Sequence, residues 1–315
     1  MAWKLAKELE ILYVSALFAV VLMPIVNRIC QIKIRGWQPS RPIGIVIMLL
    51  AVGLALSLFF LIALPPVTRD LSQFLTDLPQ RIPLAAAKLK HLPMADKLGL
   101  DTIAQKAQGA IEATASYLLT SLPMWLAHIF DILTAAFLCL YFMLEGEHAY
   151  EFFLSLIKRS ERGRLDNTLR KAEAKMSKWL LGQGLLMLCL GVTSTIVFLV
   201  FHIRYAVLLG VLMGLFNIIP VAGGIITMAV VCVAAAIDSW TKLFEVLIFY
   251  LIYVNLENAL LTPRIMKSSV DLMGLTVLVA LLVGTALAGI VGALVAVPTA
   301  ALIVVLLDEY AVKKT

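Results

Sequence analysis

The chain has 315 residues and a net charge of +6, and 62% of its residues are apolar while only 15% are charged. Soluble domains carry about 45–50% apolar and about 25% charged residues, and one compact core stops growing near about 250–300 residues. The composition therefore excludes an ordinary cytosolic enzyme, a disordered chain and a small secreted scaffold. It predicts an all-α, polytopic membrane protein with amphipathic extramembrane helices.

The cysteines, histidines and basic residues show no spacing typical of a chemical site. The cysteines lie singly, so we expect small buried side chains and no disulfide framework. No HExxH spacing occurs, and we expect no metal and no cofactor. The basic residues sit in short loops between apolar stretches, where they act as topology signals, so the positive charge does not predict nucleic-acid binding. The cysteines are Cys30, Cys139, Cys189 and Cys232.

Several stretches reach the length of about 20 apolar residues that a helix needs to cross a bilayer. A secretory signal is an alternative for the first of them, because Lys4 and Lys7 precede it, but no cleavage site follows and Asn27 and Arg28 indicate a helix end. Residues 1–64 are therefore predicted to form two N-terminal spans. The stretches lie at 9–29, 43–64, 124–144, 180–201 and 243–262.

The segment 65–123 differs from its surroundings because charged residues are interspersed with apolar ones. Pro65 and Pro66 are expected to stop the preceding helix, and three further prolines punctuate the segment, at Pro79, Pro83 and Pro93. The spacing of the apolar residues predicts short amphipathic helices outside the membrane or on its surface. These apolar residues are Val67, Leu71, Phe74, Leu75 and Leu78.

Residues 124–315 are predicted to form a C-terminal core that includes a basic segment at 145–179. Within this segment, apolar residues recur on one face of a helix that continues into the span at 180–201. The positive-inside rule places 30–42 and 145–178 in the cytoplasm. It leaves the N-terminus outside, or makes the first segment a partial crossing. The residues on the apolar helix face are Leu165, Leu169, Ala172, Met176 and Trp179.

The apolar stretch at 205–237 is longer than one span requires and is interrupted in its middle. Pro220 lacks an N–H group and clashes with a helical carbonyl, and Gly223 and Gly224 allow the backbone to turn. Broken helices build ion and substrate sites in transporters, but a simple proline kink without a ligand is the alternative. Lys313 and Lys314 lie in the cytoplasm only if this stretch is a hairpin, which the residues alone leave open.

The segment 250–264 carries two polar faces. Asn255, Asn258 and Thr262 lie within about 60° of one another on a helical wheel, whereas Glu257 points to the opposite side with two tyrosines, Tyr250 and Tyr253. An acidic residue inside a span is costly, so Glu257 is a candidate proton or cation site. The alternative is that Glu257 reaches the membrane interface and pairs with Arg264 or Lys267.

The stretch at 272–307 is long enough for two short spans joined by a tight glycine turn. Gly284, Gly289 and Gly292 lie near its middle, and small residues recur four apart around them, which favours close helix packing. Counting both interrupted stretches, the chain is predicted to have about seven or eight spans, including broken or re-entrant hairpins. His128 and Asp131 are a candidate proton relay, although such a pair more often marks the interfacial end of a helix.

Three motifs resemble the autoinducer-2 exporter family, also described as PerM-type permeases. The first is Ile219-Pro220-Val221-Ala222-Gly223; the second runs from Glu257 through Leu260-Leu261-Thr262-Pro263-Arg264-Ile265-Met266 to Ser269-Val270; the third is Gly289-Ile290-Val291-Gly292 followed by Ala296-Val297-Pro298. The order of spans and charged segments also matches, so the resemblance covers nearly the whole chain. The chain departs from the family pattern at Val221, Gly224, Lys267 and Met273-Gly274, in segments that would line a pathway.

The resemblance implies a secondary transporter in the bacterial plasma membrane, with 124–315 as its transport core and autoinducer-2-like signals or other small solutes as substrate. Sodium/proton antiport is an alternative, and a non-transporting membrane scaffold is a second. No protease, nucleotide-binding or paired-carboxylate motif predicts an enzyme. The resemblance is consistent with a homo-oligomer, such as a ring, in the lipid bilayer.

From these patterns we expect two groups of site residues, which should meet near the middle of the membrane. The turn and packing group is Gly284, Gly289, Gly292 and Pro298. The expected substrate or ion pathway is lined by Asn217, Pro220, Gly223, Gly224, Asn255, Glu257, Asn258, Thr262, Pro263 and Arg264.

Overall fold

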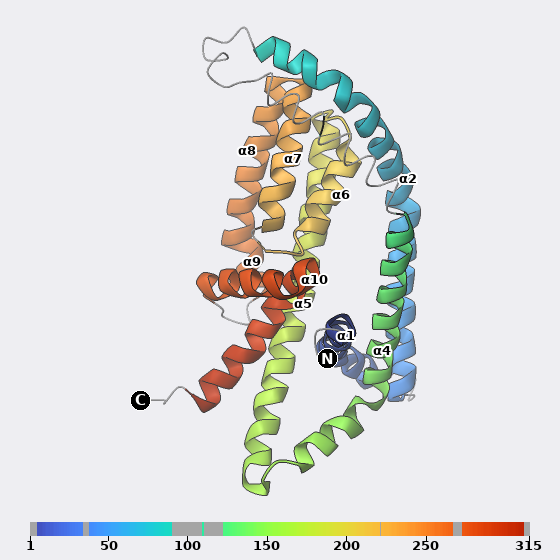
Figure 1. Ribbon diagram of the computed structural model, residues 1–315, viewed down its shortest axis with the longest axis vertical. Helices are drawn as coiled ribbons and strands as arrows, with labels where there is room; N and C mark the ends of the chain where they lie inside the picture. Colours follow the sequence, from blue (N-terminus) through green and yellow to red (C-terminus); the bar gives the residue numbers. More distant parts are fainter. Residues whose placement is uncertain are drawn as a thin grey trace. The chain divides into compact units, whose positions relative to one another are not determined.

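The computed structural model describes residues 5–33, 38–89, 109, 122–220, 222–266 and 273–311, and the regular elements in these ranges are helices (Figure 1). The chain divides into two compact units. Unit 1 comprises Met1–Leu56, His128–Gly184 and Pro263–Thr315, and unit 2 comprises Ser57–Ala127 and Leu185–Thr262.

Within the described ranges, 6 helices are long and apolar enough to cross a membrane. Two shorter apolar helices, α6 (Ala206–Phe216) and α7 (Ala222–Asp238), complete the apolar part. This confirms the predicted class, an all-helical polytopic membrane protein. The six long helical segments are Ala6–Gln31, Arg41–Asp77, His128–Ser155, Arg159–Val200, Trp240–Ile265 and Gly274–Tyr310.

The predicted helix end at Pro65 and Pro66 is wrong. The helix α2 runs from Arg41 to Leu89 and passes through this proline pair. The fixed φ angle of proline is compatible with a helix, so a proline pair can bend a helix instead of ending it. Residues 90–108 and 110–121, on which much of the predicted amphipathic segment falls, lie outside the described residues.

In unit 1, helix α1 (Ala6–Gln31) is buried on two opposite faces. Leu17 and Val21 pack with residues of α5 (Arg159–Val200) and α10 (Gly274–Tyr310). Ala19 and Val26, on the other side of the helical wheel, pack with residues of α2 and α4 (Leu122–Ser155). Since both faces are covered, α1 is a central helix of unit 1.

Polar contacts join the same helices of unit 1. The Tyr13 hydroxyl lies 2.6 Å from the Thr299 hydroxyl, which links α1 to α10. An ion pair between Arg41 and Glu147 links α2 to α4. Tyr150 donates a hydrogen bond of 2.7 Å to Asp166, which joins α4 to α5. These contacts tie the helices together beyond their apolar packing.

The predicted apolar face of the basic segment is present in α5. Ala172, Met176 and Trp179 are buried, and Met176 belongs to the cluster that includes Leu17 of α1 and Ala301 of α10. Arg164, on an exposed side of the same helix, donates 2.8 Å to the Glu309 carboxylate and stacks over the Tyr310 ring. The amphipathic turns of α5 thus cover the C-terminal half of α10.

Helix α10 is broken by its glycines. Ala288 and Gly289 leave the helical conformation, and Gly289 adopts φ 56°, a left-handed value that favours glycine. A Cβ atom at Gly284 would lie 2.5 Å from the Gly292 carbonyl oxygen, so the two arms cross with backbone against backbone (Figure 1). Gly292 and Pro298 are buried. The row formed by Thr285, Gly289 and Ala293 is therefore interrupted by the turn and is not a continuous packing ridge.

Unit 2 is built around one apolar cluster, to which α5, α6, α7 and α8 (Trp240–Leu256) contribute. Leu209 and Met213 of α6 meet Val231 of α7 in this cluster, and α6 and α7 lie side by side (Figure 1). Arg204, which precedes α6, forms an ion pair of 2.8 Å with Asp238 at the end of α7. The start of α6 and the end of α7 therefore lie next to each other. The structure thus decides the question that the residues left open: 205–237 is a hairpin. Lys313 and Lys314 themselves lie outside the described residues.

Helices α5 and α6 cross where both carry glycine. A Cβ atom at Gly214 would lie 2.9 Å from the Gly191 Cα and from the Met187 carbonyl oxygen. Neither backbone atom can move aside as a flexible side chain could. This crossing therefore depends on the absence of side chains at both glycines.

Gly214→Val should lower the melting temperature of the detergent-solubilised protein, because overpacking of this kind costs about 1–3 kcal/mol. Gly53→Val is the matched control, since nothing lies within 4 Å of a Cβ atom at Gly53. The measurement is thermal unfolding followed by circular dichroism. Equal melting temperatures for the two variants would show that the α5–α6 crossing tolerates a side chain.

Candidate functional site

The α6–α7 hairpin, residues 206–238, is too short to cross the membrane twice. Its helices have 11 and 17 residues. At about 1.5 Å per residue they reach about 16 and 26 Å, less than the roughly 30 Å of a hydrocarbon core. The geometry is that of a re-entrant hairpin, with its turn near Pro220.

The turn of this hairpin is closed by backbone hydrogen bonds. The Ile219 N–H donates to the Phe216 carbonyl at 3.1 Å, and the Gly223 N–H donates to the Ile219 carbonyl at 3.0 Å. Asn217, at the end of α6, is buried. Pro220 lies between the two helices, as its missing N–H group requires. Val221 lies outside the described residues.

The two glycines after the turn have separate roles. A Cβ atom at Gly223 would collide with the Phe216 carbonyl group, so Gly223 allows the start of α7 to return close to the end of α6. A Cβ atom at Gly224 would lie 2.6 Å from the Tyr250 hydroxyl, so Gly224 leaves room for a side chain of α8. Thr227, one turn later, is buried and donates 2.8 Å to the Gly223 carbonyl.

The helix after Tyr250 changes its winding at Glu257. Residues Glu257–Leu261 form a π-helix, followed by the short α9 (Thr262–Ile265). The Thr262 N–H bonds the Glu257 carbonyl, five residues earlier. Short π-helical turns are often found at functional sites. Sequence reasoning missed this feature, although Pro263 was a signal: it cannot donate the next helical hydrogen bond.

Glu257 and the tyrosines face the interior of unit 2. Tyr253 is only 4% exposed and belongs to the apolar cluster, and Glu257 is half-buried one turn later. Tyr253 and Glu257 are four residues apart, so their side chains lie on the same face of the helix. Tyr250, on the same side, touches the start of α7 at Gly224. The structure therefore brings Glu257 and the hairpin into one packed bundle.

The asparagines of the same segment face away from that bundle. Asn255 and Asn258 are exposed, and Asn255 donates 2.7 Å to the Leu251 carbonyl of its own helix. Thr262 is half-buried, and Pro263 and Arg264 are exposed. The two polar faces expected from the helical wheel are thus present, and the tyrosines on the face of Glu257 pack on the hairpin. Lys267, Ser269 and Val270 lie outside the described residues.

The remaining expected site residues belong to unit 1. Pro263 and Arg264 begin its last segment, and the glycine turn of α10 lies further along the same segment. The α6–α7 turn belongs to unit 2. That the two turns meet near the middle of the membrane stays a prediction.

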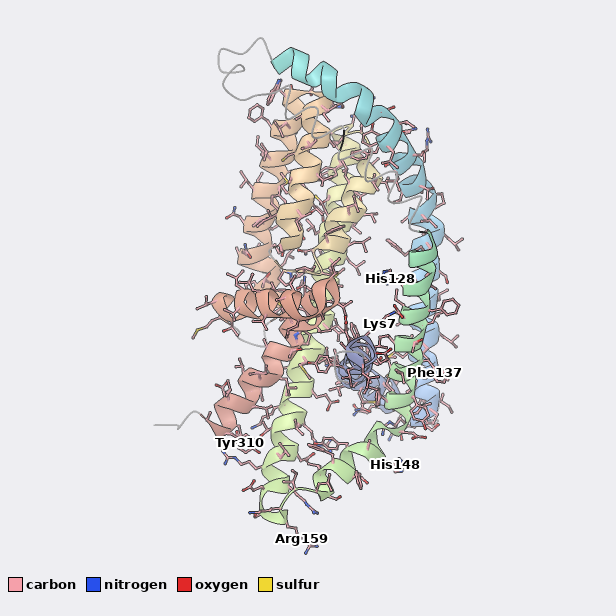
Figure 2. All side chains as sticks on the ribbon, viewed as in Figure 1. Lys7, His128, Phe137, His148, Arg159 and Tyr310 are labelled. Atoms are coloured by element: carbon pink, nitrogen blue, oxygen red, sulfur yellow. The ribbon has the colours of Figure 1, made fainter. Side chains whose placement is uncertain are left out.

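His128 and Asp131 are joined by a third residue. Lys7 of α1 forms an ion pair of 2.9 Å with Asp131 of α4, and the His128 Nδ1 atom lies 3.7 Å from the same carboxylate (Figure 2). The Asp131 carboxylate is therefore engaged by a lysine, which favours a structural role over a proton relay. Within the ranges described, no group of three or more His, Cys, Asp or Glu side chains is arranged to hold a metal ion.

Comparison of the sequence with known proteins places this chain among transporters. The sequence profile described as AI-2E family transporter matches residues 1–312. The chain is 28% identical over 247 residues to YrrI of Bacillus subtilis (strain 168), which is provisionally named a transport protein; the alignment covers 75% of this chain and 70% of YrrI. It is 24% identical over 320 residues to the AI-2 transport protein TqsA of Escherichia coli (strain K12), covering 98% and 88% of the two chains.

A third relative aligns with a shorter part of this chain. The provisionally named transport protein YueF of Bacillus subtilis (strain 168) is 26% identical over 172 residues, which is 55% of this chain and 47% of YueF. The chain thus aligns with about half the length of YueF and with most of the length of YrrI and TqsA.

Gly224→Ala should destabilise the contact between α7 and α8, because the added methyl group would meet the Tyr250 hydroxyl at 2.6 Å. Tyr250→Phe removes that hydroxyl, so the double variant should recover part of the lost stability. Coupling between touching residues amounts to about 0.5–3 kcal/mol. The measurement is a double-mutant cycle on the free energy of unfolding in detergent micelles; strictly additive effects would contradict the contact.

Proposed function

The chain belongs to the AI-2E transporter family, and from this premise we propose that it is a permease of the bacterial plasma membrane that exports autoinducer-2-like signals or other small solutes. In this proposal the protein is a transporter and catalyses no covalent chemistry. The family membership supports transport in general. The substrate and the direction of transport are the part that we add.

One observation carries the proposal beyond the family: the helix face that leads to Glu257 packs on a re-entrant hairpin through Tyr250 and Tyr253. A carboxyl group inside a span is costly and is usually functional. Here it begins a π-helical turn, one helical turn after the buried Tyr253. Tyr250, on the same face, contacts Gly224 at the start of α7. A proton or cation bound at Glu257 would therefore act next to the hairpin.

We assign the remaining residues of the pathway by their place in the hairpin and in the segment that contains Glu257. Asn217 contributes a buried amide, and Pro220, Gly223 and Gly224 form the turn that would move. Asn255 and Asn258 offer amide groups on the opposite face of the helix from Glu257, Thr262 offers a hydroxyl after the π-helical turn, and Pro263 and Arg264 follow in sequence as the start of the last segment of unit 1. Exchange of a hairpin between two positions is one way in which transporters alternate access.

Coupling to an ion follows from the same carboxyl group. If Glu257 binds a proton that is exchanged for a cation or solute, each transport cycle requires it to change protonation state. The alternative function, sodium/proton antiport, uses the same residue with a cation as the only substrate. Both functions predict that Glu257 is essential, and they differ in the substrate that is moved.

Glu257→Gln should abolish coupled transport without loss of folding, because glutamine keeps the size of the side chain and cannot ionise. The measurement uses everted membrane vesicles, with a pH-sensitive dye after addition of sodium or lithium, and with accumulation of autoinducer-2 in a parallel assay. Glu245→Gln, in the same helix α8, is the matched control and should retain transport.

The two assays separate the candidate functions. A dye response to sodium without accumulation of autoinducer-2 would support antiport, and accumulation of autoinducer-2 would support export. Unchanged transport in Glu257→Gln would remove Glu257 from the mechanism. Wild-type vesicles that are inactive in both assays would favour the non-transporting scaffold.

We further propose that the protein forms a homo-oligomer in the bilayer, with a ring as one arrangement. Asn255 and Asn258 are exposed on a membrane helix, where lipid cannot accept their hydrogen bonds. A neighbouring copy would provide partners for these amides. Asn255→Leu together with Asn258→Leu should then weaken chemical cross-linking between copies in native membranes. Unchanged cross-linking would exclude this face as the contact.

A further inference from the structure

The first turn of α6 has no capping residue of its own. Tyr205 occupies the N-cap position with φ 57° and ψ 34°, and its side chain forms no capping hydrogen bond. The N–H groups of Val207 and Leu208, the second and third residues of the helix, need acceptors that an N-cap side chain normally supplies. In this chain the acceptor is instead Asp70 of α2.

Asp70 accepts both of these hydrogen bonds with one carboxylate oxygen. Its Oδ2 atom lies 3.2 Å from the Val207 nitrogen and 3.1 Å from the Leu208 nitrogen. A negative charge at a helix N-terminus also interacts favourably with the helix dipole. The partner is 137 residues away in the sequence, so this cap joins two separate helices of unit 2.

Two further contacts fix the residue at the N-cap position against α2. The Tyr205 hydroxyl donates a hydrogen bond of 3.0 Å to Asp77. The Tyr205 ring packs edge-to-face on Phe74, with ring centroids 5.3 Å apart. Asp70, Phe74 and Asp77 follow one another at helical spacing, so one face of α2 holds the start of the hairpin.

The C-terminal end of the hairpin also binds residues next to the start of α6. Asp238, the last residue of α7, is paired with Arg204 at 2.8 Å and with Lys242 of α8. Lys242 also donates 2.6 Å to the His202 carbonyl, and Arg204 lies 3.9 Å from Asp77. Both ends of the hairpin therefore depend on one polar network, which α2 enters through Asp77.

The backbone just before α6 is held in an unfavourable conformation. His202 and Tyr205 both have positive φ angles, 51° and 57°, which are uncommon for residues other than glycine. Such conformations persist where the surrounding contacts hold them. At Tyr205, the contacts come from Phe74, Asp77 and, through the following turn, Asp70.

We propose that Asp70 is a positioning residue for the re-entrant hairpin: from α2 it fixes where α6 begins, and hence where the turn around Pro220 lies. The effect on transport rests on the proposed function, whereas the positioning itself does not. A shift of α2 relative to α6 would break both hydrogen bonds at once, since they share one oxygen atom.

The test is hydrogen–deuterium exchange of the purified full-length protein in nanodiscs, read on peptides that contain 206–209. Asp70→Ala should speed exchange there by about 2- to 30-fold, which is the range that corresponds to loss of an N-cap. Asp70→Asn keeps an oxygen acceptor without the charge and should show a smaller increase. Asp70→Glu should largely restore protection. Ser72→Ala, exposed on the same helix, is the matched control and should match the wild type.

Transport by the same variants separates this inference from the proposed function. Slower transport by Asp70→Ala, with recovery in Asp70→Glu, would support positioning. Exchange at 206–209 that is equal in Asp70→Ala and Ser72→Ala would overturn the proposal, whereas faster exchange with unchanged transport would confirm the positioning and overturn its effect on transport. If Asp70→Ala does not fold, Asp70→Asn decides on the same criteria. If the wild type moves neither sodium nor autoinducer-2, both antiport and autoinducer-2 export fail, while the exchange data still decide the positioning.

Discussion

Backbone N–H and C=O groups need partners inside a bilayer, and this requirement shapes the irregular segments of the chain. At the α6–α7 turn, the partners are carbonyls of the preceding turn, those of Phe216 and Ile219. Before Pro263, a π-helical turn lets the Thr262 N–H reach the Glu257 carbonyl. At the start of α6, the partner comes from another helix, through Asp70. At these three places in the described part of the chain, the irregular backbone is accompanied by partners for its N–H groups.

Close contact between helix backbones is a second consequence of the lipid environment. Without a hydrophobic driving force between helices in lipid, packing depends on how closely they approach. Gly191 and Gly214 let α5 and α6 cross, and Gly284 and Gly292 let the arms of α10 cross. Gly223 serves the hairpin in the same way. The broken helices are therefore tightly packed structures and not loose loops.

In each unit, a charged residue of a long helix binds one end of a broken helix. Asp70 of α2 binds the N-terminal end of α6 in unit 2. In unit 1, Arg164 of α5 binds the carboxylate and the backbone carbonyl of Glu309, at the C-terminal end of α10. A negative charge at an N-terminus and a positive charge at a C-terminus both match the helix dipole. Each unit thus contains a long helix whose charge stabilises a broken one.

The sequence by itself determined the features that depend on local composition and periodicity. The apolar content predicted a helical membrane protein, and the wheel of 165–179 predicted the buried Ala172, Met176 and Trp179. The helix break near Pro220 also followed from local chemistry. Only the tertiary structure decided that 205–237 is a hairpin, that α2 continues through Pro65 and Pro66, and that the face with Tyr250 and Tyr253, rather than the Asn255 face, packs on the hairpin. These outcomes depend on contacts between residues far apart in the chain, such as Arg204 with Asp238 or Asp70 with Leu208, which no local pattern encodes.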